Sequence, residues 1–186
     1  MKIISDDTWN DELWQDASLL YREAFGFKGA KPVEIIRNMF AQEIAELHVA
    51  YNGTKAVAMA LTGKLKKERV MIIDYLAVSE KERNNGLGKQ FVDSLRQKAS
   101  DEGLQLLLIE VESEETAENK RRIRFWQSCG FLLTEYVHHY IWVPEPYQAM
   151  YLPFHAESKK ASGEELFKLI DLFHRRSFYT GKKLDG

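Results

Sequence analysis

A glycine-rich turn is the first place in this sequence where phosphate chemistry is expected. Residues 83–89 read Arg-Asn-Asn-Gly-Leu-Gly-Lys; they follow the apolar run RVMIIDYLAV at residues 69–78 and open a helical pattern. Glycine lets the main chain approach an anion closely, and the N–H groups and dipole at the start of a helix favour negative charge. The pattern therefore predicts an anion site at this turn.

Two well-known phosphate motifs do not fit this turn. A Walker A loop needs glycine five positions before Gly88 and Ser or Thr after the lysine, but those positions hold Arg83 and Gln90. A dinucleotide fingerprint needs a third glycine where Phe91 stands. On this turn alone, a connection that contains glycine and binds nothing is the remaining alternative.

A second segment helps to decide whether the glycine-rich turn binds a ligand. Residues 119–131 read NKRRIRFWQSCGF. Together with the earlier Arg-x-x-Gly-x-Gly, this segment resembles the GCN5-related N-acetyltransferase (GNAT) superfamily, whose pattern N-x-x-A-x-x-[FL]-Y-x-x-x-G-F it matches at Asn119, Phe125, Gly130 and Phe131. The resemblance covers about residues 1–155. It implies the α/β acyl-CoA N-acyltransferase fold, a mixed sheet with splayed central strands, and acetyl-CoA as co-substrate.

The resemblance also implies how acetyl-CoA is held. The strand at residues 76–78 would be splayed from its neighbour, and its free main-chain groups would pair with the amides of pantetheine as another strand would. The turn would wrap the pyrophosphate, with Arg83 capping the turn or touching phosphate. The residues implied to bind the co-substrate are Leu76, Ala77, Val78, Arg83, Asn84, Asn85, Gly86, Leu87, Gly88, Lys89, Asn119 and Trp126.

A cluster of basic residues follows Asn119. Arg121, Arg122 and Arg124 are candidates for the adenosine 3′-phosphate. A solvated helix face is the alternative for all three.

Two carboxylates are candidates for the general base. The segment Leu106-Leu-Leu-Ile-Glu-Val-Glu112 places Glu110 and Glu112 on one face of a strand, because side chains alternate along it. Glutamate is depleted from strands. Family members with an L-E-V segment here use its Glu as base, usually through water, so the resemblance implies that role for Glu110, with Glu112 next. An exposed acid paired with a nearby arginine is the alternative.

The general acid is where the sequence departs from the family. Trp126 stands where the family usually has Tyr, and an indole N–H donates a hydrogen bond but supplies no proton at useful pH. Tyr136, Tyr140 or Tyr147 could substitute, because they lie in the region that lines the acceptor site in the family. Alternatively, the thiolate leaves without an acid.

The cysteine and the histidines point to no further chemistry. Cys129 could be a ping-pong nucleophile with His138 or His139 as base, but it precedes the glycine that ends a helix, where a small buried residue is common. The five His show no metal-ligand spacing. We therefore predict a direct attack of a primary amine on acetyl-CoA in a ternary complex, without metal. A non-catalytic acyl-CoA-binding or regulatory module is the alternative function.

Apolar spacing and turn residues predict the elements that position these groups. Two helices are expected before the first strand, one from Leu13 to near Gly26 and one from Pro32 to about Ala45. The remaining expected elements are strands at 47–51 and 55–62 around Asn52-Gly53, a central strand at 69–78, a helix at 86–99, a strand at 105–111, a helix at 119–128, strands at 131–143 and 150–155, and a helix opened by the capping box Ser162-x-x-Glu165. We expect a GNAT domain over residues 1–155 and a C-terminal helical extension over 156–186 packed on the same domain.

Composition limits the remaining possibilities. The 186 residues are 45% hydrophobic and carry 26 Lys and Arg against 28 Asp and Glu, for a net charge of −2. A chain of this size buries about 70% of its unfolded surface, so its core needs no disulfide. Near-neutral charge argues against nucleic acid, and the apolar runs are too short for a membrane span. A single Cys and no signal-peptide pattern predict a reducing cytoplasm. The expected partner is a small-molecule or peptide amine, and a homodimer is left open.

Overall fold

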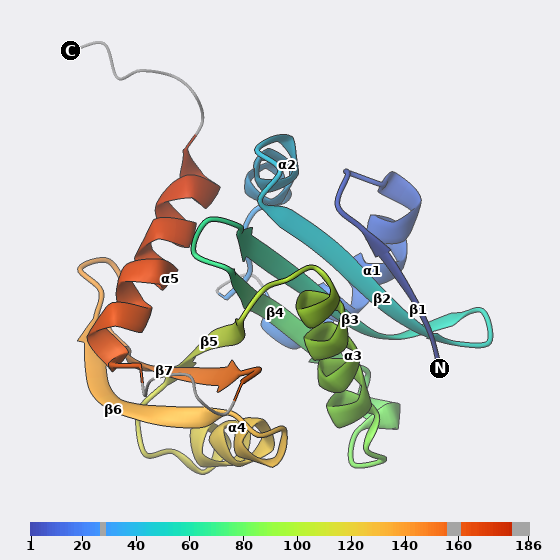
Figure 1. Ribbon diagram of the computed structural model, residues 1–186. Helices are drawn as coiled ribbons and strands as arrows, with labels where there is room; N and C mark the ends of the chain where they lie inside the picture. The colour runs from blue at the N-terminus through green and yellow to red at the C-terminus, as the bar shows by residue number, and fades with distance from the viewer. Residues whose placement is uncertain (27–28, 156–160, 180–186) are drawn as a thin grey trace. The chain divides into compact units, whose positions relative to one another are not determined.

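The computed structural model describes residues 1–26, 29–155 and 161–179. Within these residues seven strands follow the order β1-β2-β3-β4-β5-β7-β6 in a mixed sheet, accompanied by five α-helices (Figure 1). These described residues divide into two compact units, the first within residues 1–64, 74–88 and 172–179 and the second within residues 65–73 and 89–171. This architecture confirms the predicted mixed α/β fold.

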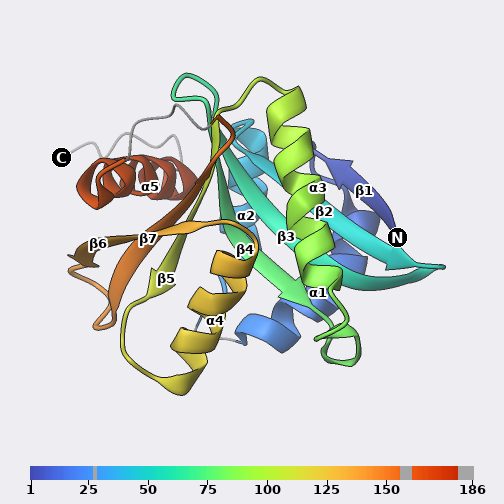
Figure 2. The ribbon, with the colours of Figure 1, turned by 60° about the horizontal axis from the view of Figure 1, so that its bottom comes forward.

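The first unit holds the antiparallel part of the sheet. Its elements are β1 (Lys2–Asp6), α1 (Asp11–Phe25), α2 (Val33–Ala41), β2 (Ala45–Asn52) and β3 (Lys55–Leu65). Both helices contact β2, and in Figure 2 they lie behind β2 and β3. The N-cap of α1 is Asn10, whose side chain accepts a hydrogen bond from the Leu13 N–H at 3.0 Å, and the helix stops at Gly26, where φ is 57°. Leu13, Ala17, Leu20 and Tyr21 form its buried face.

Three sequence predictions in this unit were wrong in detail. The strand β1 was missed; it is a short, largely exposed strand that pairs antiparallel with β2 from Lys2↔Tyr51 to Asp6↔Leu47. The helix predicted to reach Ala45 ends at Ala41, because Glu43 adopts a φ of 55° and Ala45 pairs with Gly63 in the sheet. The hairpin turn lies at residues 53–54 rather than 52–53, since Asn52 still pairs with Lys55.

The second unit holds the crossover and the last strands. β5 (Leu106–Glu112), α4 (Ala117–Ser128), β6 (Leu132–His139) and β7 (Pro146–Pro153) lie entirely within it. β5 pairs with β7 along its whole length, from Leu106↔Pro153 to Glu112↔Tyr147, and α4 contacts β5 and β6 (Figure 2). β6 was predicted to continue to residue 143 but ends at His139. The chain then turns back into β7, and Ile141 and Trp142 are 97% and 75% exposed.

Three elements continue from one unit into the other. β4 (Val70–Val78) and α5 (Gly163–Phe178) begin in the second unit and end in the first, whereas α3 (Leu87–Asp101) begins in the first. The predicted capping box of α5 is present: Glu165 N–H donates to Ser162 Oγ at 3.2 Å, and Ser162 N–H donates to Glu165 Oε2 at 3.3 Å. The predicted boundary between a domain at 1–155 and an extension at 156–186 stays a prediction; residues 156–160 lie outside the described part.

The C-terminal half of α5 is held by close contacts within the first unit. Asn38 and Gln42 of the α2 region donate to the main-chain oxygens of Ser177 and Arg176 at 2.9 and 2.7 Å, which satisfies carbonyl groups at the helix end. Phe173 is fully buried and fills the space beside Gly63, where an added Cβ would lie 2.1 Å from its ring. This part of α5 is therefore built into the core of the unit.

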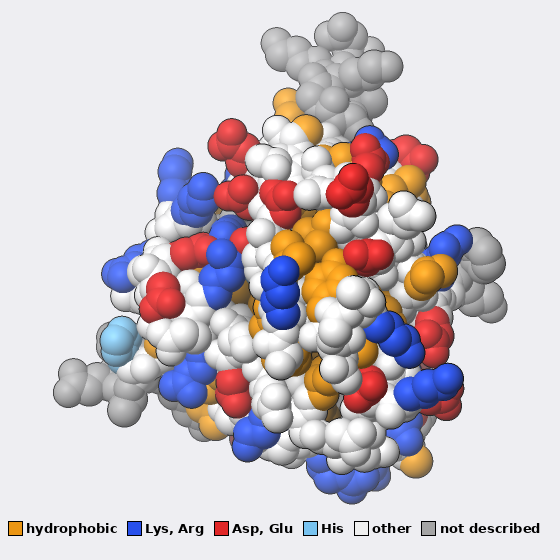
Figure 3. Space-filling model, turned by 90° about the vertical axis from the view of Figure 1, so that its right-hand side faces the viewer, with side chains coloured by type: hydrophobic (Ala, Val, Ile, Leu, Met, Phe, Trp, Pro, Cys, Tyr) orange, Lys and Arg blue, Asp and Glu red, His pale blue; other side chains and the backbone are white. Residues whose placement is uncertain are grey.

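The surface carries charges of both signs. Figure 3 shows one face on which Lys and Arg are interspersed with Asp and Glu around a few hydrophobic side chains. Across residues 1–26, 29–155 and 161–179 no helix has the length and apolar character needed to cross a membrane.

Candidate functional site

The turn after β4 has a backbone conformation that suits its residue types. Asn84 and Gly86 adopt φ values of 66° and 77°, in the left-handed region that glycine and asparagine tolerate best. Arg83 donates from Nε to the Val78 carbonyl at 3.1 Å, which is the contact of a residue that caps the turn, and its contact with phosphate stays a prediction. The turn leads directly into α3, whose N-terminal N–H groups have no intrahelical acceptor.

The start of α3 has no acidic residue of its own. Each of the other α-helices in the described chain has at least one acid in its first turn, whereas α3 has none. An acid there would complement the helix dipole and compete with an external anion. The N-terminus of α3 thus keeps its attraction for phosphate.

The end of β4 combines half-buried residues with a buried hydroxyl. Ala77 is 4% exposed, whereas Leu76 and Val78 on either side of it are half-buried. Ser79 is also buried, and its Oγ has no hydrogen-bond partner among the described residues. Such an orphaned buried hydroxyl is unusual and fits a site that a polar ligand completes.

The parallel pairing of β4 with β5 is short. In the second unit it runs from Val70↔Leu106 to Ile72↔Leu108, while β5 continues as a strand to Glu112. Splaying of residues 76–78, which the resemblance implies, stays a prediction.

Glu110 and Glu112 share the less buried face of β5. Both are half-buried, whereas Ile109 and Val111 between and beside them are 2% and 7% exposed. Glu110 Oε2 accepts a hydrogen bond from the Tyr140 hydroxyl at 2.7 Å. Glu112 lies 3.8 Å from Arg122, which also pairs with Glu118 at 2.6 Å. The two carboxylates therefore differ in their partners: Glu110 accepts a hydrogen bond from a phenol, whereas Glu112 lies beside an arginine.

Three aromatic rings lie beside the ring of Tyr140, whose hydroxyl donates to Glu110. The ring of Tyr140 lies 4.6 Å from His138, 5.5 Å from Trp142 and 5.6 Å from Tyr147, measured between centroids. Burial, and next the negative charge of Glu110, raise the pKa of Tyr140 well above its usual range. Burial and the charge of Glu112 raise the pKa of Tyr147 to about 12. Both phenols thus stay protonated at physiological pH.

Comparison with known proteins identifies the family. The sequence profile of the acetyltransferase (GNAT) family matches residues 9–131. The chain belongs to this family. No curated protein matches the sequence. The match to the family profile confirms the resemblance and the acetyltransferase class.

Solved structures share the fold at low sequence identity. A GNAT-family protein from Bacteroides thetaiotaomicron aligns with a TM-score of 0.70 and 18% identity over 98% of this chain and 100% of its own. The ribosomal-protein-S18-alanine N-acetyltransferase of Escherichia coli gives 0.64 and 18% over 86% and 99% of the two chains. A Bacillus subtilis acetyltransferase in complex with CoA gives 0.58 and 19% over 83% and 99%. These likenesses show that the chain shares the fold of these proteins.

Most of the family's second signature segment lies in α4. Two of its side chains, those of Asn119 and Trp126, pack against or bond to other residues of the chain. Asn119 is 4% exposed and donates to the Glu114 carbonyl at 3.2 Å, which ties down the start of the helix. Trp126 packs between Phe125 and Phe131, with ring centroids 5.1 Å from each. Arg121 and Arg124 are exposed. Binding of the co-substrate by Asn119 and Trp126 stays a prediction.

The other nucleophile and metal candidates gain no support from the geometry. Cys129 is 6% exposed, and burial raises the pKa of its thiol, which lowers the fraction of reactive thiolate. His138 stacks on Phe167 at 4.4 Å and lies 4.0 Å from Asp171, while its neighbour His139 is exposed. Tyr136 also packs on Phe167, at 5.8 Å, and its hydroxyl lies 3.5 Å from His138 Nδ1. In the described part of the chain no His, Cys, Asp and Glu side chains gather as a metal ion would require.

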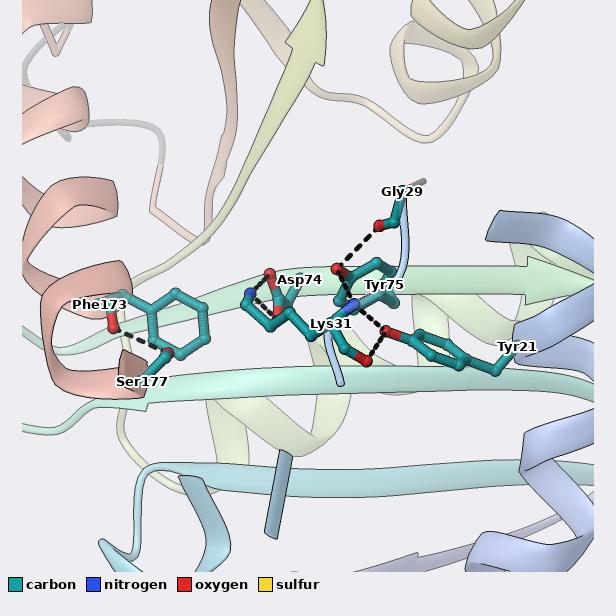
Figure 4. Close-up of polar contacts among 7 residues, drawn as sticks. All are labelled: Tyr21, Gly29, Lys31, Asp74, Tyr75, Phe173 and Ser177. Atoms are coloured by element: carbon teal, nitrogen blue, oxygen red, sulfur yellow. Dashed lines mark hydrogen bonds and ion pairs between the residues drawn. The ribbon is translucent and has the colours of Figure 1, made fainter. Parts of the chain in front are cut away.

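Sequence reasoning missed one polar cluster altogether. Lys31, from the connection between α1 and α2, donates from Nζ to both carboxylate oxygens of Asp74 on β4 at 2.6 Å (Figure 4). Tyr21 and Tyr75 hold the main chain of the same lysine. A signal was present, since Asp74 is the one charged residue inside the apolar run at 70–78. Its partner, 43 residues away, could not be read from the pattern.

Proposed function

We propose that this protein is an acetyl-CoA-dependent N-acetyltransferase that acts on a primary amine by direct attack in a ternary complex. The observation that carries the proposal is the Glu110 carboxylate, placed at the end of β5 and held by the Tyr140 hydroxyl at 2.7 Å, in a chain of the GNAT family. Glu110 lies in the Ile-Glu-Val segment that resembles the family's base-carrying strand.

The acyl donor is assigned to the end of β4 and the following turn. The positive φ values of Asn84 and Gly86, the acid-free start of α3 and the orphaned Ser79 hydroxyl all suit a polar, anionic ligand. In this proposal the N–H groups of residues 84–89 bind the pyrophosphate. The main chain of Leu76, Ala77 and Val78 pairs with the amides of pantetheine.

Glu110 acts as the general base. An ammonium group must lose a proton before its nitrogen can attack the thioester carbonyl, and a carboxylate accepts that proton directly or through one water. The Tyr140 hydroxyl stabilises the ionised carboxylate and fixes its orientation, because a charge-assisted hydrogen bond is shorter and stronger than a neutral one. Glu112 is the weaker candidate, since Arg122 lies beside it.

The departing thiolate leaves without an acid from this chain. Proton donation becomes less efficient as the pKa of the donor rises, and the pKa values of Tyr140 and Tyr147 are both raised. Trp126 donates a hydrogen bond only. A thiolate is a good leaving group, so unassisted departure is the simplest proposal.

The acceptor is a small-molecule or peptide amine. The single buried cysteine still favours a reducing cytoplasm. A non-catalytic acyl-CoA-binding module is a second candidate because Trp126 replaces the family's usual tyrosine.

Thiol release in the presence of amines separates the two candidates. A panel of primary amines is incubated with acetyl-CoA and the protein, and free CoA is measured with a thiol reagent. An enzyme releases CoA with at least one amine, whereas a binding module releases none although acetyl-CoA raises its melting temperature. Equal shifts of melting temperature with acetyl-CoA, ATP and NAD would contradict a specific donor site, since stabilisation follows the affinity of each ligand for the native state.

A further inference from the structure

Lys31 and Asp74 form a buried ion pair within the first unit. The side chains of Lys31 and Asp74 are only 8% and 6% exposed, and the Nζ atom contacts both carboxylate oxygens at 2.6 Å. Burying two charges is costly unless their geometry is close and their hydrogen bonds are satisfied. The short bidentate contact meets that condition.

Aromatic rings complete the enclosure of the ammonium group. The Nζ atom lies 5.3 Å from the centroid of the Tyr75 ring and 5.4 Å from that of Phe173 on α5. Figure 4 shows the lysine side chain running between these two residues toward Asp74. A carboxylate with two ring faces is the chemistry that proteins use to bind alkylammonium ions. Here, Lys31 of the chain itself supplies that ion.

The main chain of Lys31 is anchored separately from its ammonium group. Its N–H donates to the hydroxyl oxygens of Tyr21 at 2.7 Å and Tyr75 at 3.1 Å, and its carbonyl accepts from Tyr21 at 3.3 Å. The Tyr75 hydroxyl also donates to the Gly29 carbonyl at 3.1 Å. These bonds hold the main chain of Gly29 and Lys31 beside β4 whether or not the long, flexible side chain of Lys31 remains paired with Asp74.

We propose that Asp74, Tyr75 and Phe173 form a subsite for the second ammonium group of a diamine or polyamine acceptor, and that Lys31 occupies this subsite until the acceptor replaces it. The inference rests on the proposed acetyltransferase function and names its substrate class. Exchange of one alkylammonium for another leaves the number of buried charges unchanged, so Asp74 is never left unpaired. The released Lys31 ammonium regains its hydration.

The place of Asp74 in the chain fits this role. Leu76, where the strand segment proposed for pantetheine begins, follows Asp74 by two residues, which is about 7 Å along a strand. An acceptor anchored at Asp74 by one nitrogen would reach this part of β4 with a short carbon chain. The subsite thereby selects amines with a second positive charge.

Thermal melting tests the subsite without any acetyl transfer. In Lys31→Met the subsite has lost its internal ammonium, and saturating butylamine should raise the melting temperature by about 5 °C. The same amine should not stabilise the double variant Lys31→Met/Asp74→Asn. Lys64→Met is the matched control, because Lys64 pairs with buried Glu46 at 2.6 Å. Equal stabilisation of Lys64→Met, or none of Lys31→Met, would overturn the proposal.

Steady-state kinetics provides a second test that does not depend on Lys31→Met folding. Asp74→Asn should raise the KM for 1,4-diaminobutane by about tenfold while changing the KM for butylamine much less. Equal changes in KM for the two amines would show that the Lys31–Asp74 ion pair has a purely structural role. Absence of turnover with every amine would instead contradict the proposed function, and the melting experiment would still report on the subsite.

Discussion

The hydrogen bond between Tyr140 and Glu110 allows a test of the proposed base. The perturbations are Glu110→Gln, which removes the basic oxygen, and Tyr140→Phe, which keeps the ring contacts and removes only the hydroxyl. Tyr140 donates to Glu110 at 2.7 Å, and both residues are half-buried, so solvent screens the bond only in part. The two variants therefore affect the same carboxylate in different ways.

The expected magnitudes follow from the chemistry of the pair. Loss of a general base lowers kcat by about 10² to 10⁴-fold, which is the prediction for Glu110→Gln at neutral pH. A hydrogen bond to a charged group contributes about 1.5 to 3 kcal/mol, and one pH unit corresponds to about 1.4 kcal/mol. Because the bond favours the ionised carboxylate, Tyr140→Phe should move the acid limb of the pH–rate profile toward higher pH.

The assay is release of CoA as a function of pH at acceptor concentrations below KM. The rate of CoA release by Glu110→Gln should approach that of the wild type at high pH, where the free amine is abundant and needs no base. Tyr140→Phe should have no further effect in the Glu110→Gln background, since the hydroxyl acts through that carboxylate. Tyr147→Phe is the matched control, because Tyr147 belongs to the same aromatic cluster and its hydroxyl donates no hydrogen bond within the described residues.

Two results would refute this reasoning. Full activity of Glu110→Gln at neutral pH would remove Glu110 from the mechanism and favour Glu112 or one of the tyrosines. An acid limb that moves equally in Tyr140→Phe and Tyr147→Phe would show that the shift comes from the cluster rather than from the hydrogen bond.

Three further predictions concern the turn, the tyrosines and the packing of α5. Gly86→Val should weaken CoA binding in calorimetry because φ is 77° there, whereas Gly53→Val, with φ of 61° in the turn between β2 and β3, should cost similar stability and leave CoA affinity unchanged. Burial raises the pKa of Tyr21 from 10.0 to about 12, so the stability that its neutral hydroxyl contributes is complete below pH 10 and is lost toward pH 12. In denaturant unfolding, Tyr21→Phe should therefore lose about 2 to 3 kcal/mol less than the wild type between pH 10 and pH 12. Gly63→Ala should destabilise the protein by about 1 to 3 kcal/mol because the new Cβ would lie 2.1 Å from Phe173; a variant as stable as the wild type would show that α5 is free to shift.

Much of the candidate site could be predicted because its signals are local. The positive φ values at Asn84 and Gly86 depend on residue types within the turn itself. The alternation along β5 brings Glu110 and Glu112 to one face whatever packs beside them. The capping box of α5 joins residues three positions apart. Each of these features follows from neighbours in the chain, so the sequence alone determined them.

The contacts that complete the site were decided only by tertiary packing. Tyr140 meets Glu110 across 30 residues, and Lys31 meets Asp74 across 43. Asp74 and Glu110 each stand out in their own apolar strand, but no local pattern could name the distant partner of either. Sheet pairing likewise decided that residues 2–6 form a strand and that Ala45 leaves the helical pattern for β2, because main-chain hydrogen bonds to a neighbouring strand outweigh a weak local preference. The sequence thus determined which residue types stand ready on each element, and the packing of distant elements decided which of them meet.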